Sequence, residues 1–123
     1  EQKGIIASQG YFQQVDSPAN NTFVKQFADK FGADKPINYI GISVYQTAML
    51  YAKAVEKAGS LEPEKVVAAI SQVEVDGPIG VMRVEAGNNH AVLGNYLAQV
   101  NDKAKFDILK VNPPMPPLAG CTL

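Results

Sequence analysis

Hydrophobic and polar positions along the chain predict one short strand before any helix. The apolar run at 4–8 is typical of a short buried strand, and an aromatic pair, Tyr11 and Phe12, follows it. A helix is expected to start at Ser17–Pro18, because serine accepts hydrogen bonds from first-turn N–H groups and proline suits the first helical position. The chain therefore enters its helical part after about 16 residues.

An aromatic stripe marks the first predicted helix. Phe23, Phe27 and Phe31 recur at every fourth position, and Gly32 follows where a glycine cap is expected. This spacing predicts that the three rings pack in the core. Asn20, near the start of the same helix, opens an Asn-x-Thr sequon, which we interpret as a chance match at a helix start.

The longest predicted helix covers about 41–58 and ends before Gly59, and a third helix begins at 62–64. Apolar residues of the long helix fall on two faces, one with Ile42, Tyr45, Met49 and Ala52 and another with Val44, Ala48, Tyr51 and Val55. A helix with so wide an apolar arc is usually covered on more than one side. The two neighbouring helices are too short to provide that cover.

The periodicity then changes from helical to alternating. Strands are predicted over 73–76, 80–84, 96–100 and 105–111, and 101–104 is the turn of a hairpin between the last two. The fold class is therefore α/β, with a strand, three helices, and then strands and a hairpin. This order resembles a segment of a larger α/β protein more than a complete sheet with its helices.

Composition allows one modest domain and excludes some partners. The chain has 123 residues, 46% hydrophobic and 19% charged, with a formal net charge of −1. That length suits a single domain, and the near-neutral balance lacks the basic surface that nucleic-acid binding requires. No apolar run approaches the roughly 18 residues needed to span a membrane.

Candidate chemistry is sparse. A single cysteine, Cys121, and a single histidine, His90, exclude a disulfide within the chain and a Cys/His metal cluster. Ser8 and Asp76 could be named beside His90 as a triad, but no nucleophile-elbow sequence surrounds a serine. The glycines at 77–80 enclose a proline and precede no Lys-Ser/Thr, so they indicate a tight turn and no phosphate loop. We expect no catalytic residues, no metal and no cofactor.

Six short motifs, in this order and spacing from about Gly10 to Val111, resemble the C-terminal part of a type I periplasmic solute-binding protein. The branch it is most similar to holds the branched-chain amino acid, amide and urea receptors of ABC transporters. The first motif combines Tyr11-Phe12 with Asp16-Ser17-Pro18-Ala19-Asn20, the second is the phenylalanine stripe with Gly32, and the third combines Tyr45 with residues 54–60. The other three motifs are residues 63–66, residues 76–80 and Asn88-Asn89-His90.

The resemblance implies a two-lobed α/β clamp with three hinge-crossing strands and a ligand held between the lobes. Residues 1–12 would end the second-lobe sheet, 13–91 would be a first-lobe segment, 92–111 would cross back as a second-lobe hairpin, and 112–123 would be a Pro-rich tail. The implied hinge residues are Val15, Asp16, Val92, Leu93 and Val111. Such receptors are much longer than 123 residues, so we expect a C-terminal fragment whose apolar helix faces are exposed.

The implied ligand wall is the loop that leads into the long helix, with Tyr39, Ile40 and Ile42. Relatives often carry an aromatic residue at the position of Ile40, and amide and urea receptors carry an acid at that of Ile42. Isoleucine at both positions departs from that pattern and leaves the solute unnamed. The implied partners are a small polar solute, amino-acid-like or amide-like, and an ABC permease, in the periplasm or cell envelope with a signal peptide upstream of this chain.

Two other functions remain open from the residues. One is a cytoplasmic ligand-sensing regulator of the amidase-operon type, which has the same fold. The other is a short interaction module that associates with itself, as a homodimer or a swapped pair, through exposed helix faces. A signal peptide in the gene would exclude the first, and a compact monomer at all concentrations would count against the second.

Overall fold

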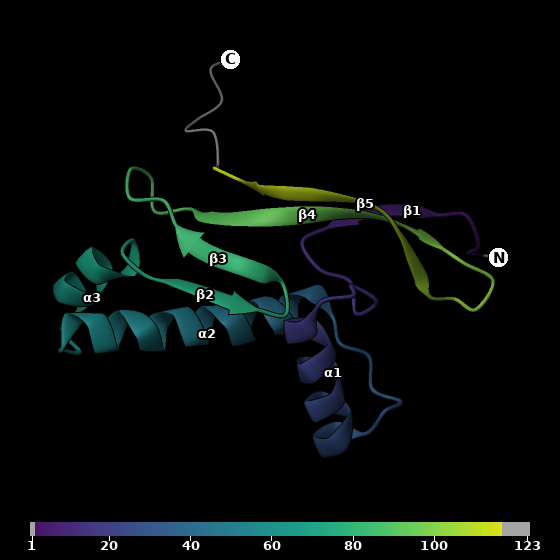
Figure 1. The fold of residues 1–123 in the computed structure, drawn as a ribbon, viewed down its shortest axis with the longest axis horizontal. Coiled ribbons are helices and arrows are strands. Elements are labelled where there is room, and N and C mark those ends of the chain that lie inside the picture. The colour runs from purple at the N-terminus through teal and green to yellow at the C-terminus, as the bar shows by residue number, and fades with distance from the viewer. Residues whose placement is uncertain (1, 117–123) are drawn as a thin grey trace, which may run out of the picture.

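The computed structural model describes residues 2–116, which form three helices and five strands in a mixed α/β arrangement (Figure 1). This confirms the predicted order of a strand, three helices and further strands. Cys121 and the end of the predicted tail lie outside the described residues. In chain order the elements are β1 (Ile6–Gln9), α1 (Pro18–Phe31), α2 (Tyr39–Ala58), α3 (Pro63–Ile70), β2 (Glu74–Gly77), β3 (Gly80–Val84), β4 (Ala91–Val100) and β5 (Phe106–Met115).

β4 connects all parts of the antiparallel sheet. Its first residues pair with β3, where Val92 lies opposite Arg83. Its second half pairs with β1 and β5, and Tyr96 lies opposite both Gln9 and Val111. One ten-residue strand thus links the β2–β3 hairpin beside the helices to the long β4–β5 hairpin (Figure 1).

Polar caps and glycines set the helix ends, as the sequence indicates. Ser17 accepts a hydrogen bond from the backbone N–H of Asn20, and Pro18 occupies the first turn of α1. α2 begins two residues earlier than predicted because the Asn38 side chain caps it, and it ends at Gly59 in the left-handed conformation that glycine adopts without cost.

Two separate hydrophobic cores form around this framework. We call the first the helix-side core; its buried members are Tyr11, Ile42, Leu50, Val75, Ile79 and Met82. We call the second the hairpin-side core; its buried members are Phe12, Val15, Tyr96 and Ala98. The neighbouring residues Tyr11 and Phe12 belong to different cores, so this segment runs between the two and contributes a side chain to each.

α2 buries a face that the apolar periodicity of its sequence does not single out. Its buried residues are Ile42, Gln46, Leu50 and Ala54, spaced four apart, whereas Tyr45 and Met49 are exposed. Gln46 lies at the centre of this buried face, where it bonds to the β2–β3 hairpin, while the exposure of Tyr45 and Met49 agrees with the expectation that apolar helix faces are exposed in this chain. The second predicted face, around Val44 and Tyr51, is exposed in the described residues.

The phenylalanine stripe of α1 is not buried in a core, contrary to the prediction. Phe31 is 54% exposed, while Phe23 and Phe27 are partly covered and stack on each other with ring centroids 6.0 Å apart. α1 projects away from the sheet (Figure 1), so only Phe23 reaches the helix-side core, where its ring lies 4.8 Å from that of Tyr45.

β5 continues four residues beyond the predicted end at Val111. Pro113 and Pro114 lie inside it, where they donate no backbone hydrogen bond, and the pairing with β4 shifts register between Leu93 and Asn95. Gly94 lies at that shift, and a Cβ there would approach the Asn112 carbonyl oxygen to 3.0 Å. The residues at 112–115 are therefore strand, a feature that the proline content of the segment concealed.

Candidate functional site

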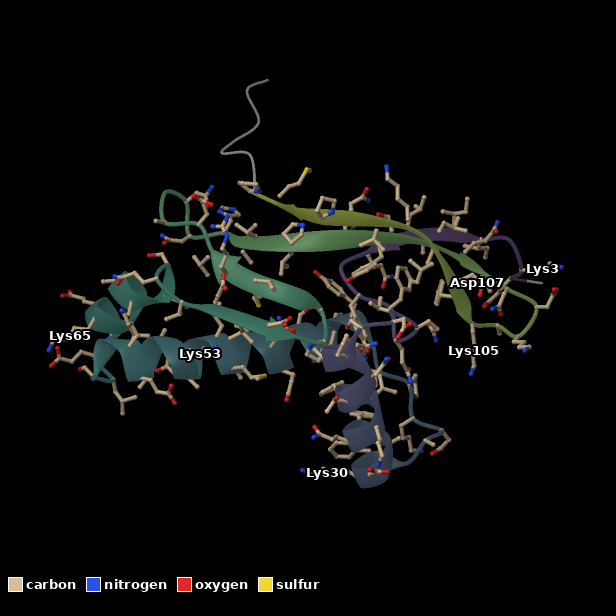
Figure 2. All side chains as sticks on the ribbon, viewed as in Figure 1. Lys3, Lys30, Lys53, Lys65, Lys105 and Asp107 are labelled. Carbon is tan, nitrogen blue, oxygen red and sulfur yellow. The ribbon has the colours of Figure 1, made fainter. Side chains whose placement is uncertain are left out.

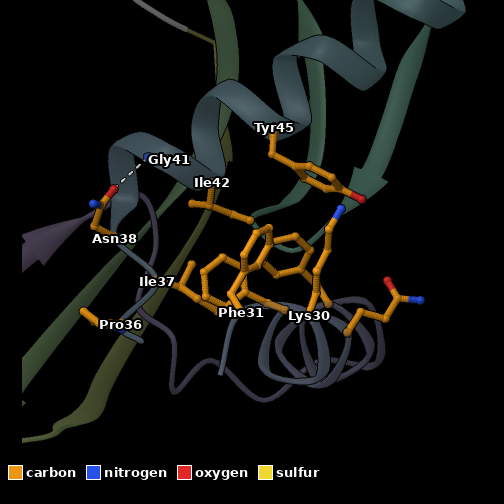
Figure 3. A pocket seen from close by; sticks show the side chains of 11 residues that line it. Lys30, Phe31, Pro36, Ile37, Asn38, Gly41, Ile42 and Tyr45 are labelled. Carbon is orange, nitrogen blue, oxygen red and sulfur yellow. Dashed lines mark hydrogen bonds between the residues drawn. The ribbon is translucent and has the colours of Figure 1, made fainter. Parts of the chain in front are cut away.

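Two hydrogen bonds build the loop that leads into α2. The Asn38 side-chain oxygen accepts the Gly41 N–H at 2.7 Å, which satisfies a donor at the helix start (Figure 3). The Gln13 side-chain oxygen accepts the Ile37 N–H at 3.1 Å. The loop before α2 is therefore held to the segment that connects β1 with α1, across 24 residues of sequence.

Tyr39 lies directly over Gly10, at the end of β1. A Cβ at Gly10 would be 2.7 Å from the Tyr39 ring carbon Cε2, closer than real Cβ contacts, so any larger residue there requires the ring to move. The Tyr39 carbonyl oxygen also accepts a hydrogen bond from the Ser43 hydroxyl at 2.8 Å. These contacts place an aromatic side chain at the junction between β1 and the start of α2.

The three residues expected to form the ligand wall lie in different environments. Ile40 is 73% exposed and Tyr39 is partly exposed, whereas Ile42 is 1% exposed and belongs to the helix-side core. Tyr39 and Ile40 are thus available to a ligand at the same end of α2. Ile42 points to the other side, where it forms part of a separate hollow.

This second feature, the aromatic hollow, lies between α1 and the start of α2 and encloses about 500 Å³ (Figure 3). Its polar groups are few, and the Lys30 ammonium lies 5.4 Å from the centre of the Phe31 ring. The lining residues are Phe23, Gln26, Phe27, Lys30, Phe31, Pro36, Ile37, Asn38, Gly41, Ile42 and Tyr45. Its walls are mainly apolar, as in many ligand sites and many unfilled packing interfaces.

The structure places the five expected hinge residues in two groups. Val15 and Asp16, on the segment after β1, line a hollow of about 640 Å³ together with Val111 of β5. Val92 and Leu93 lie near the start of β4. Val92 is buried and pairs with β3, whereas Leu93 pairs with Met115 of β5. Val15 is itself a member of the hairpin-side core, and Leu93 packs against the helix-side core.

Asn20 organises the segment after β1, a role that its sequence context did not reveal. Its buried side chain accepts a hydrogen bond from the Tyr11 hydroxyl at 2.9 Å and donates to the Gln13 and Val15 carbonyl oxygens at 3.2 and 2.6 Å. Both the oxygen and the nitrogen of the Asn20 side chain are therefore engaged in hydrogen bonds within the protein. The sequon at Asn20 is therefore inaccessible to glycosylation in the folded chain, which agrees with a chance match.

Gln46 plays the corresponding role for the β2–β3 hairpin. Its side-chain nitrogen donates to the Gly80 and Val75 carbonyl oxygens at 2.6 and 3.3 Å, and its oxygen accepts the Ile79 N–H at 3.1 Å. Gly77 is needed beside it, because a Cβ there would lie 2.5 Å from the Gln46 oxygen. The only sequence signal for this contact was a glutamine four residues after Ile42 and four before Leu50.

Within residues 2–116, the three residues that could be named as a catalytic triad make other contacts. Ser8 donates to the Asn95 side chain, and His90 contacts the carbonyl oxygen of Asn88 in its own turn, so neither faces Asp76 as a triad would require. Charged side chains point outward around the molecule, with labelled lysines at well-separated places (Figure 2). Within residues 2–116, no three His, Cys, Asp or Glu side chains lie close enough to hold a metal ion.

Burial perturbs two tyrosines. Removal of Tyr11 from water raises its pKa to about 12, and the same cause raises the pKa of Tyr96. Both are core side chains, one in each core, and both stay neutral at physiological pH.

In the part of the chain that the structure describes, no helix is both long and apolar enough to cross a membrane.

Comparison with known families accounts for this arrangement. The sequence model of the periplasmic binding protein domain matches residues 1–119. The chain belongs to this family. The resemblance found in the motifs is thereby confirmed, and the family consists of binding proteins and not of enzymes.

Solved structures of ABC-transporter binding proteins superpose on nearly the whole chain. A solute-binding protein from R. palustris, in complex with benzoate, is 22% identical with a TM-score of 0.82, and the match covers 99% of this chain and 34% of that one. A substrate-binding protein from Sphaerobacter thermophilus is 22% identical (TM-score 0.80; 92% and 32%). A branched-chain amino acid binding protein from Burkholderia xenovorans LB400 is 23% identical (TM-score 0.78; 92% and 31%). This periplasmic binding protein domain thus spans about a third of the length of the structures it matches.

Proposed function

We propose that the chain is part of the solute-binding component of an ABC importer that works in the periplasm or cell envelope. In this function, two lobes close on a small solute and present it to a membrane permease. The family match over residues 1–119 carries the proposal. The separation into two cores supports it, because a clamp needs two bodies that move relative to each other.

The connections between the cores are suited to a hinge. The chain crosses between them at Tyr11–Phe12, and β4 joins the β2–β3 hairpin to the β4–β5 hairpin. The proposed hinge residues Val15, Asp16, Val92, Leu93 and Val111 lie at these connections or beside them. Backbone rotation confined to a few such positions can move packed lobes without disturbing either core.

The proposed solute contacts in this chain are Tyr39 and Ile40. Both are accessible at the start of α2, next to the segment after β1, and both offer apolar surface. Ile42 is less suited to direct contact because its side chain is buried, and in this proposal it supports the helix start from below. The remaining walls of the cleft would come from residues outside this chain.

A small amino acid or a small aromatic acid is the class of solute that fits. Structures of this fold bind benzoate in one case and are named for branched-chain amino acids in another. An aromatic and an aliphatic wall, Tyr39 and Ile40, can contact the apolar part of either solute, while the partners of its carboxylate lie elsewhere. This keeps the expectation of an amino-acid solute and adds aromatic carboxylates to it.

Direct binding measurements on the longest protein encoded by the reading frame that contains these residues would test the proposal. Thermal-shift screening against amino acids, amides and benzoates, followed by calorimetry, should yield at least one solute that stabilises the protein. Tyr39→Ala and Ile40→Ala should weaken that binding, and Leu61→Ala, another exposed apolar residue remote from the start of α2, is the matched control. A protein that binds none of these solutes would contradict the proposal.

A further inference from the structure

Position 10 carries a glycine that its own backbone does not require. Gly10 directly follows β1 and does not have one of the positive φ angles that other residues avoid. The three atoms closest to a Cβ at this position all belong to Tyr39: Cε2 at 2.7 Å, and Cζ and the hydroxyl oxygen at 3.3 Å. The Tyr39 ring is therefore what the absence of a side chain at position 10 accommodates.

The backbone that carries the Tyr39 ring is held on both sides of the residue. The Gln13 side chain accepts the Ile37 N–H at 3.1 Å, and the Ser43 hydroxyl donates to the Tyr39 carbonyl oxygen at 2.8 Å. A methyl group at position 10 would therefore displace the ring more readily than the backbone.

The direction of that displacement follows from the exposure of the ring. To regain an ordinary contact distance, the ring must retreat from position 10 by about 1 Å. Tyr39 is 37% exposed, and its next neighbour in the sequence, Ile40, is 73% exposed. The open side of the ring is thus the side on which a solute can reach it, and the ring would move toward that side.

We propose that Gly10 is a positioning residue of the solute site and acts through Tyr39. Because position 10 has no side chain, the ring lies back against the end of β1 and leaves room for the solute beside Ile40. The inference rests on the proposed function, in which Tyr39 and Ile40 contact the solute. A larger residue at position 10 would push the ring into the space of the solute and lower the affinity without touching the solute itself.

A double-mutant cycle measured by solute binding tests this role in the longest protein encoded by the reading frame that contains these residues. The probes are benzoate, 4-hydroxybenzoate and L-leucine, and calorimetry gives the Kd of each probe that the parent binds. Gly10→Ala should raise this Kd roughly fivefold or more. It should do the same in the Tyr39→Phe background, which keeps ring carbon Cε2. In the Tyr39→Leu background, whose side chain ends before that atom, the change should stay within about twofold.

Gly87→Ala is the matched control, because a Cβ there meets no atom within 4 Å, and it should leave each Kd within about twofold of the parent. An equal loss of affinity from Gly10→Ala in the Tyr39→Leu background would overturn the inference, because the methyl group would then act through a different contact or through stability. An unchanged Kd in Gly10→Ala would overturn it as well.

The position of the ring can also be measured in the 123-residue chain without any solute. Nuclear Overhauser effects between the Gly10 α-protons and the Tyr39 ring protons should be present, and their absence would overturn the inference. A parent protein that binds none of the probes would contradict the proposed function, and with it the solute role of Gly10. A parent that binds a probe equally well after Gly10→Ala would overturn this inference alone.

Discussion

Tyr11 donates its phenolic hydrogen to the side-chain oxygen of Asn20 over 2.9 Å, inside the protein. The bond joins the last residues before the crossing between the two cores to the first turn of α1. Through its amide nitrogen, Asn20 also holds the backbone of the connection at Gln13 and Val15. One buried side chain thus fixes the path of the segment where the proposed hinge begins.

Removal of the Tyr11 hydroxyl should destabilise the chain. Tyr11→Phe leaves the Asn20 oxygen buried without its donor, which costs about 1–3 kcal/mol of unfolding free energy. Urea unfolding followed by circular dichroism measures this cost. Tyr39→Phe is the control: its phenol is partly exposed, and the variant should unfold within about 0.5 kcal/mol of the parent. An equal loss for both variants would contradict a special role for the Tyr11–Asn20 bond.

The raised pKa of Tyr11 predicts a loss of stability in alkali. The folded state holds the Tyr11 proton up to about pH 12, whereas the unfolded state releases it near pH 10. The contribution of this group is therefore fully present below pH 10 and is lost as the pH rises from 10 to 12, by up to about 1.4 kcal/mol per pH unit. Unfolding of Tyr11→Phe should depend less steeply on pH across this window. A slope identical to that of the parent would show that Tyr11 does not titrate on unfolding.

The contact between Gln46 and Gly77 should make that glycine intolerant of substitution. Gly77→Ala places a methyl group 2.5 Å from the oxygen of the Gln46 side chain, which three hydrogen bonds through its oxygen and nitrogen hold in place, so we expect a loss of about 1–3 kcal/mol. Gly87→Ala is the matched control, because a Cβ there meets no atom within 4 Å. In the Gln46→Ala background the cost of Gly77→Ala should shrink, and strict additivity of the two changes would contradict the contact.

Gly10 should matter because of the ring that lies over it. In Gly10→Ala the added methyl group would lie 2.7 Å from the Tyr39 ring and push the ring aside. We expect a loss of about 1–2 kcal/mol in the unfolding free energy. In the Tyr39→Ala background the same change should be close to neutral. Denaturant unfolding of the four proteins of this double-mutant cycle measures the coupling energy. A coupling energy near zero would show that the two residues do not interact.

Much of the fold follows from local signals in the sequence. Ser17, Pro18 and Gly59 lie where helices begin or end, and the predicted alternating segments lie within β2, β3, β4 and β5. These signals are local because each acts through hydrogen bonds or backbone angles within a few residues. The family resemblance came from the order and spacing of such signals, and the match over residues 1–119 confirms it.

The contacts that position the candidate site could not be predicted in this way. Gln46 lies in the buried face of α2 because of groups on a hairpin some 30 residues later, and helical periodicity alone assigns a glutamine to water. The phenylalanine stripe was expected in a core, yet nothing within residues 2–116 closes over Phe31. Both observations have one physical origin, since burial depends on partners that are distant in the sequence.

Calorimetric titration of the isolated 123-residue chain with amino acids and benzoates tests the central claim most directly. If the chain supplies only the Tyr39–Ile40 part of a cleft whose other walls lie elsewhere in a two-lobed fold, it should show no saturable heat with any of these solutes. The longest protein encoded by the same reading frame should bind at least one of them. Micromolar binding by the isolated chain would contradict the account, because these 123 residues would then form a complete site on their own.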